Sequence, residues 1–117
     1  FSGLVRDLDE SRKILSLTLE HYPGMTETSL GKIITEAKAR WSILDATVIH
    51  RIGELMAEEQ IVLVAVASLH RQDAFSACEF IMDYLKTRAP FWKKCRDESG
   101  ESWVEAKETD KEADKRW

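Results

Sequence analysis

Hydrophobic and polar residues change their spacing several times along this chain, and each change predicts a new element. Leucines at positions 15, 17 and 19 alternate with polar residues, which is the two-residue period of a half-buried strand. Pro23 and Gly24 end that strand, and Thr26 followed by Glu27 predicts a capped helix start. Apolar residues then recur at positions 30, 33, 34, 37 and 41, which predicts a helix with one face on a sheet.

The second half of the chain shows the same change of period. Residues 46–55 predict a strand bent at Gly53, and the unbroken apolar run 61–67 predicts a central strand covered on both faces. A helix over 72–88 is expected to bury one apolar face, made of Ala74, Phe75, Ala77, Cys78, Ile81, Met82 and Leu85. Residues 91–96 and 102–105 predict short strands, 1–6 a strand end, 7–13 a polar, mobile loop, and 106–117 a charged tail.

These elements predict an α+β fold in which two helices pack on a mostly antiparallel sheet. With 117 residues the chain makes one domain, 1–117. Its net charge of −4 disfavours general nucleic-acid binding, and its longest apolar run is far shorter than the ~20 residues of a membrane helix. Cys78 and Cys95 have no metal-type or redox-type spacing, so we expect a reducing cytoplasm.

The stretch 86–94 is positively charged, although the chain as a whole carries a net negative charge. Lys86, Arg88, Lys93 and Lys94 lie within nine residues, around a turn set by Pro90. One interpretation is an anion site, and the other is that Lys86 and Arg88 interact with the negative end of the helix dipole while the lysines are solvated. The residues alone leave both interpretations open.

Two His-Arg pairs are further candidates. His70 and Arg71 fall where the central strand ends and a helix begins, so backbone amides and a bidentate guanidinium could hold a phosphate, with Arg6 joining them. The alternative for His70 is a strand-end histidine bonded to backbone. His50 and Arg51 lie within a predicted strand, and we interpret them as structural, with a role in a site as the alternative.

Four blocks together resemble the large, catalytic subunit of molybdopterin synthase. They are Leu19-Glu20-His21-Tyr22-Pro23-Gly24-Met25, Ile49-His50-Arg51-Ile52-Gly53, His70-Arg71, and the run from Tyr84 to Lys93. The resemblance extends over the whole chain, with the blocks in the right order and spacing. It implies an α/β hammerhead fold with an additional small antiparallel sheet, and a homodimer that binds one small ubiquitin-like subunit at each end, giving a heterotetramer.

The resemblance also implies a sulfurtransferase activity. Sulfur from the thiocarboxylated C-terminal Gly-Gly of the small subunit is transferred to cyclic pyranopterin monophosphate, forming the dithiolene of molybdopterin, without a metal or cofactor on the large subunit. Lys86 and Lys93 match the family's two active-site lysines, and Arg6, His70 and Arg71 match its substrate-anion site. Because guanidinium cannot exchange a proton near neutral pH, we expect Lys86 to act as the proton-exchanging amine, with Lys93 assisting by charge.

Two positions differ from the family pattern. Family members carry a further N-terminal segment before the position of Phe1, which we expect this sequence to lack. Lys107 stands where some relatives have an arginine that reaches the partner subunit's pocket, and a lysine keeps the charge without the planar fork. The alternative function is a non-catalytic α+β module that binds a ubiquitin-like partner; the presence of both lysines with Arg6, His70 and Arg71 favours catalysis.

Overall fold

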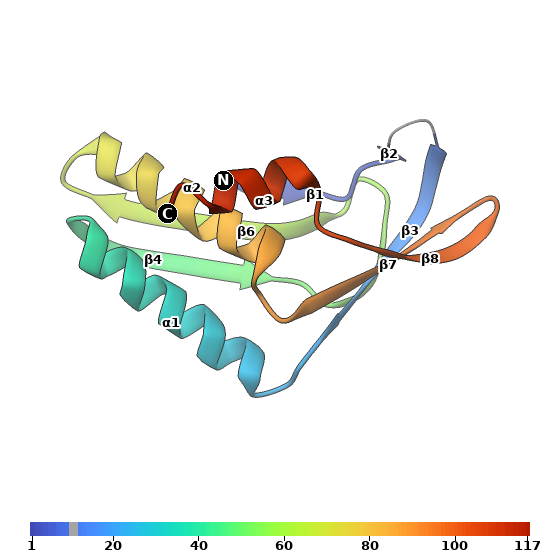
Figure 1. Cartoon of the computed structure of the whole chain (residues 1–117), viewed down its shortest axis with the longest axis horizontal. Coiled ribbons are helices and arrows are strands. Elements are labelled where there is room, and N and C mark those ends of the chain that lie inside the picture. The colour runs from blue at the N-terminus through green and yellow to red at the C-terminus, as the bar shows by residue number, and fades with distance from the viewer. Residues whose placement is uncertain (10–11) are drawn as a thin grey trace.

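The structure is a computed structural model that describes residues 1–9 and 12–117, a part of the chain with eight strands and three helices (Figure 1). The elements in chain order are β1 (Ser2–Leu4), β2 (Leu8–Asp9), β3 (Arg12–His21), α1 (Met25–Arg40), β4 (Ile43–His50), β5 (Gly53–Met56), β6 (Gln60–Ser68), α2 (Arg71–Thr87), β7 (Phe91–Asp97), β8 (Gly100–Val104) and α3 (Glu108–Asp114). The loop expected over 7–13 includes β2 and the start of β3, and residues 10–11 lie outside the described part.

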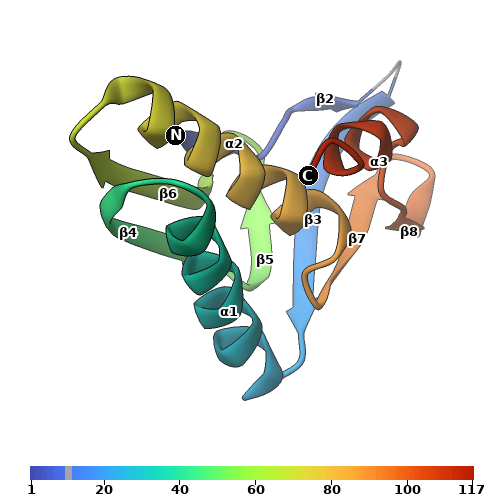
Figure 2. The same cartoon turned by 60° about the vertical axis from the view of Figure 1, so that its left-hand side comes forward.

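The strands form two antiparallel sheets. The first has the order β1-β6-β4, and the second has the order β2-β3-β7-β8 with β5 also paired to β3. Figure 2 shows β4 and β6 on one side of the molecule and β3, β7 and β8 on the other. The predicted α+β class with helices on antiparallel sheets is confirmed, and α3 is a third helix within what the sequence predicted to be a charged tail.

The main core lies between α1, α2 and one face of the first sheet. Its buried members are Ile33 and Ala37 of α1, Val62 and Val64 of β6, and Ala77, Phe80, Ile81 and Leu85 of α2. Phe80 is completely buried, whereas Phe75, which the sequence placed in the core, is 72% exposed. The reason is helical geometry: Ala77, Ile81 and Leu85 recur every four residues on one face, and Phe75 lies on the opposite face.

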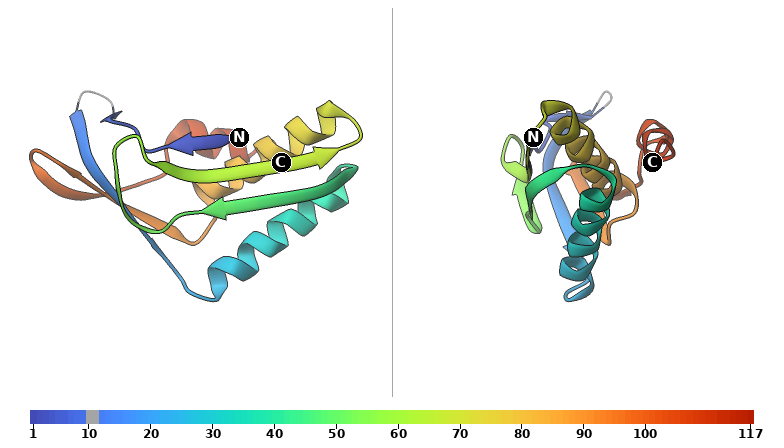
Figure 3. Two further views of the ribbon diagram at one scale, coloured as in Figure 1. Left: turned by 180° about the vertical axis from the view of Figure 1, so that it is seen from behind. Right: turned by 90° about the vertical axis from the view of Figure 1, so that its left-hand side faces the viewer.

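The other face of the first sheet is not covered by any described element of this chain (Figure 3). Leu63 of β6 is 38% exposed, and Ile49, its register partner on β4, is 54% exposed. The prediction that β6 is covered on both faces is therefore wrong for a single chain. An apolar open face of this kind is typical of a surface that another protein covers.

Residues 46–55 are not one strand but two, in different sheets. β4 ends at His50 in the first sheet, and β5 begins at Gly53 and pairs with β3 in the second. Gly53 has a φ of 84°, a left-handed conformation that favours glycine, so the chain turns out of one sheet and into the other at this point.

Two further local predictions are corrected. The N-cap of α1 is Gly24, and its N–H donates to the Glu27 carboxylate at 2.8 Å, while Thr26 lies inside the helix and donates to the carbonyl of Tyr22. The buried face of β3 changes along the strand. Ile14 and Ser16 are buried in its first half, and only further on does the predicted face, with Leu19, become buried. The register with β7 is also irregular between Ile14 and Ser16.

Candidate active site

The turn between α2 and β7 brings two lysines together. Lys86 lies in the last turn of α2, and the chain then reverses through Pro90 so that β7 runs antiparallel to β3. The N–H of Phe91 donates to the carbonyl of Ala89 at 2.8 Å, which closes this turn. Because side chains of a strand alternate between faces, Phe91, Lys93 and Cys95 point the same way, and all three line one cavity with Lys86.

This cavity has a volume of about 380 Å³ and collects cations from four separate segments. Arg6 comes from the segment after β1, Lys86 from α2, Lys93 from β7 and Lys107 from the residue that caps α3. Among the described residues, the rest of the wall is mostly apolar, and Glu105 and Asp110 are its two acidic members. An apolar pocket with a few convergent charged groups is the usual form of a small-molecule site, and these charges select an anion.

Lys93 has the strongest electrostatic perturbation around the cavity. Its pKa is lowered from 10.5 to about 8, first by burial and then by the positive charge of Lys86. Asp110 opposes this effect, while Arg6 and a hydrogen bond with Lys86 add to it. Lys93 can therefore gain or lose a proton near neutral pH, which an ordinary lysine cannot do.

His70 and Arg71 lie at the opposite end of α2 from Lys86. His70 is the N-cap residue, its carbonyl accepts a hydrogen bond from the hydroxyl of Ser68, and Arg71 is the first, exposed residue of the helix. At a rise of about 1.5 Å per residue, Arg71 and Lys86 are about 22 Å apart along the helix axis. The structure therefore brings Arg6, Lys86, Lys93 and Lys107 together, and it does not bring His70 and Arg71 to the same cavity within one chain.

His50 is close to the lysine pair, which the sequence did not predict. Its ring stacks on Phe91 with centroids 4.0 Å apart and planes 20° apart. Burial and the positive charges of Lys93 and Lys86 lower its pKa, whereas the hydrogen bond that the ring donates to the carbonyl of Arg51 raises it. Arg51 has the structural role that we expected, since it donates to the carbonyl of Gln60 at 3.0 Å. No local signal identifies His50, because β4 and β7 belong to different sheets and meet only in the folded chain.

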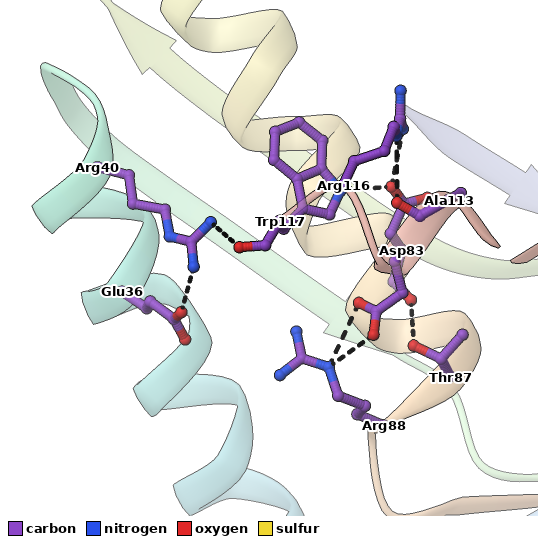
Figure 4. A network of polar contacts seen from close by, with 9 residues as sticks. Glu36, Arg40, Asp83, Thr87, Arg88, Ala113, Arg116 and Trp117 are labelled. Carbon is purple, nitrogen blue, oxygen red and sulfur yellow. Dashed lines mark hydrogen bonds and ion pairs between the residues drawn. The ribbon is translucent and has the colours of Figure 1, made fainter. Parts of the chain in front are cut away.

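α3 forms one wall of the cavity and is held by the last residues of the chain (Figure 4). The indole of Trp117 lies within 5.5 Å of the rings of Trp41 and Phe80 and donates to Asp83 at 2.6 Å. Arg116 binds Glu79 and Asp83, and Arg88 binds Asp114 at 3.0 Å. These contacts attach α3 to α2, and so they place Lys107 and Asp110 at the cavity.

No helix in the described part of the chain has the length and apolar character needed to cross a membrane.

Comparisons with known proteins agree with this architecture. The model of the family described as MoaE protein matches residues 1–88. Proteins named molybdopterin synthase catalytic subunit from Ralstonia nicotianae and Escherichia coli are each 56% identical over 117 residues. The matches cover all of this chain, but only 66% of the first protein and 78% of the second.

Solved structures give the same result. A MoaE protein from Burkholderia ambifaria is 53% identical, with a TM-score of 0.81 over 100% of this chain and 76% of that one. A molybdopterin synthase from Staphylococcus aureus is 36% identical, with a TM-score of 0.83 over 89% of this chain and 76% of that one. A complex of subunits 1 and 2 of molybdopterin-converting factor from Helicobacter pylori, 24% identical with a TM-score of 0.70 over 92% of this chain and 69% of that one, shares the fold.

Proposed function

The chain belongs to the MoaE protein family, as its sequence resemblance predicted, and from this premise we propose that it is the catalytic subunit of a molybdopterin synthase. In this proposal, sulfur passes from the thiocarboxylated C-terminus of a small ubiquitin-like subunit to cyclic pyranopterin monophosphate, and two transfers form the dithiolene. The observation that carries the proposal is the cavity in which Lys86 and Lys93 lie together with Arg6 and Lys107.

The four cations suit the charges of both reactants. A thiocarboxylate and a cyclic phosphate are both anions, so bringing them together in one apolar cavity needs compensating positive charge. Arg6 offers a planar fork for phosphate oxygens, and Lys107 offers a point charge at the start of α3. Glu105 and Asp110 reduce the total charge of the cavity without neutralising it.

The lowered pKa of Lys93 supports a division of roles that reverses our sequence-based expectation. With a pKa of about 8, Lys93 would have about a quarter of its molecules neutral at pH 7.5, so it can both accept and donate a proton. Lys86 is exposed, and its charge is the second cause of the lowered pKa of Lys93. We therefore assign proton transfer to Lys93, and to Lys86 the charge that tunes it and holds the anion.

His70 and Arg71 fit this proposal if two copies of the chain form a dimer through the open face of the first sheet. In a two-fold dimer, the same face is used by both copies, and a strand that crosses the axis at about a right angle runs antiparallel to its equivalent. β6 pairs with β1 so that Gln60, at its start, lies opposite Leu4, which lines the cavity, whereas His70 follows the end of β6. Antiparallel packing of the two β6 strands would therefore bring His70 and Arg71 of one copy toward the cavity of the other.

Mixing two inactive variants tests this arrangement. Lys93→Ala and Arg71→Ala chains are each expected to give little product alone. If each cavity takes Arg71 from the other copy, a mixed dimer has one doubly defective cavity and one intact cavity, so random mixing restores about a quarter of wild-type activity. If all residues act within one chain, the mixture stays as inactive as its components, and the shared cavity is refuted.

The proposed partner is a ubiquitin-like protein whose last two residues are glycines. A tail without side chains can approach the lysine pair closely, beside the Pro90-Phe91 turn. The test combines the purified chain, thiocarboxylated partner and pterin precursor, and measures dithiolene product. A partner with an ordinary C-terminal carboxylate is the matched control and should bind without giving product. Complex formation with no product from the thiocarboxylated partner would instead support the non-catalytic module.

A further inference from the structure

His50 connects the two sheets through Phe91, a residue that lines the cavity. It is the last residue of β4 and pairs in register with Val62 of β6, so its backbone belongs to the first sheet. Its ring, however, stacks on Phe91, the first residue of β7 in the second sheet, with centroids 4.0 Å apart. Phe91 packs against the buried clusters of both sheets, so this stack is a side-chain link between the two halves of the fold.

The imidazole is held in one orientation. Its Nδ1 lies 2.8 Å from the carbonyl oxygen of Arg51. Because a carbonyl can only accept a hydrogen bond, Nδ1 carries the proton, and Nε2 of the neutral ring is the unprotonated nitrogen. Because the imidazole of His50 is held by this hydrogen bond, its stack on Phe91 limits the rotation of the Phe91 ring and keeps Phe91 in place.

Phe91 and Lys93 are coupled by the geometry of β7. They are two residues apart on a strand, so their side chains share one face, and both line the cavity. A displacement of Phe91 would move the start of β7 and open the wall next to the Lys93 ammonium. Water entering at that point would remove the desolvation that is the largest cause of the lowered pKa of Lys93.

The charges around His50 require a neutral ring. Lys93 of β7 and Lys86 of α2 both act on it and lower its pKa, after the larger effect of burial. Arg6 and Asp110 act on the neighbouring Lys93, and the Arg51 guanidinium binds the carbonyl of Gln60 and the Glu59 carboxylate. A protonated His50 would add another cation beside the two lysines, and the lowered pKa of His50 disfavours this at neutral pH.

We propose that His50 is a positioning residue for the lysine pair: its neutral imidazole, stacked on Phe91, holds the start of β7 so that Lys93 stays desolvated beside Lys86. His50 acts through Phe91 and takes no part in proton transfer itself. This inference rests on the proposed role of the lysine pair in sulfur transfer.

The test measures how readily the Lys93 amine reacts as pH is varied. The full chain is labelled with acetic anhydride between pH 6 and 11, without partner or pterin, and modification of Lys93 is followed by peptide mass spectrometry. Three variants are compared with wild type: His50→Ala removes the stack, His50→Phe keeps a stacking ring without a titratable group, and Val48→Ala is the control. Val48 lies two residues earlier on β4 and packs on the main core, so its truncation costs stability without touching the stack.

The wild-type midpoint for Lys93 is expected near 8. We expect His50→Ala to raise it by about one unit, which lowers the neutral fraction at pH 7 about tenfold and reduces product formation by a similar factor. His50→Phe should keep both values near wild type, and so should Val48→Ala. An unmoved midpoint in His50→Ala, or an equal loss of activity in His50→Ala and Val48→Ala, would overturn the proposal.

A second variant covers the case in which His50→Ala does not fold. His50→Leu fills a similar volume but cannot stack as a ring, so we expect a shift in the same direction; an unmoved midpoint there would also overturn the proposal. The labelling midpoint is independent of sulfur transfer. If the midpoint moves while the reconstituted wild-type chain gives no product, the proposed function fails and the positioning role of His50 stands.

Discussion

Replacing Lys93 by methionine should stabilise the protein while abolishing its activity. At pH 7 the folded chain holds a charged ammonium where burial and Lys86 lower its pKa from 10.5 to about 8. Each pKa unit corresponds to about 1.4 kcal/mol, so the charged form reduces the free energy of unfolding by about 3 kcal/mol. Methionine has a similar length and no charge, so Lys93→Met should regain up to about 3 kcal/mol, or roughly 12 °C in Tm for a chain of this size.

The sign of the pH dependence makes this prediction specific. Unfolded lysine keeps its proton up to about pH 10.4, so between about pH 8 and pH 10.4 the unfolded state binds more protons than the folded state. The stability of the wild-type chain therefore rises with pH across this window, as the cost of the charge disappears. The advantage of Lys93→Met should be largest below pH 8 and should vanish as pH approaches 10.4.

The assay is urea denaturation of both chains at pH 7 and at pH 10, with product formation measured separately. Lys94→Met is the matched control, because Lys94 lies on the other face of β7, where its ammonium is 4.8 Å from the centre of the Trp103 ring and 3.8 Å from Glu101. That substitution should give no gain at either pH. If Lys93→Met is no more stable than wild type at pH 7, or if its advantage is the same at both pH values, Lys93 is not a desolvated amine and the reasoning fails.

Three further outcomes are expected. Lys86→Ala should lose most product formation and raise the labelling midpoint of Lys93, whereas Lys86→Arg keeps the charge and should retain measurable activity. Equal activities in the two variants would show that the charge of Lys86 does not tune the pKa of Lys93. Arg71→Ala should weaken pterin binding and reduce its salt dependence, measured by calorimetry at two ionic strengths, and unchanged affinity would make Arg71 structural. Trp117→Ala should lower the free energy of unfolding by about 3 kcal/mol in chemical denaturation, because it removes an indole from contact with Trp41 and Phe80.

Local patterns in the sequence predicted most of the elements but not how strands are shared between sheets. The helical period over 72–88 gave α2 to within one residue at each end, and the turn at Pro90 placed Lys86 and Lys93 close together. The sequence predicts one strand over 46–55, because alternation of hydrophobic residues does not show that the chain leaves one sheet and enters another after His50. Only the left-handed Gly53 marks that change, and from the sequence alone it predicts no more than a bend.

The candidate site shows the same limit. Four of the six site residues expected from the resemblance line one cavity, and His70 and Arg71 do not, because the two ends of a long helix cannot meet within one chain. The sequence favours a structural role for His50, since its proximity to Lys93 depends on a contact between sheets that no local spacing encodes. The sequence does not predict α3, because five of its seven residues are charged and its attachment depends on Trp117, beyond its end.

The number of residues in α2 is constrained in evolution, because both ends of this helix are proposed to be functional. Its first residue, Arg71, and Lys86 near its end are proposed to serve different cavities, and an α-helix turns by about 100° and rises about 1.5 Å with every residue. A single residue inserted or deleted inside α2 would rotate one functional end away from its cavity while leaving the other in place. By contrast, the exposed turn between β7 and β8 at Glu98 and Ser99 can change length without moving either end. Variation in length should therefore collect at this turn and be absent from α2, which a library of one-residue insertions scored for product formation would measure.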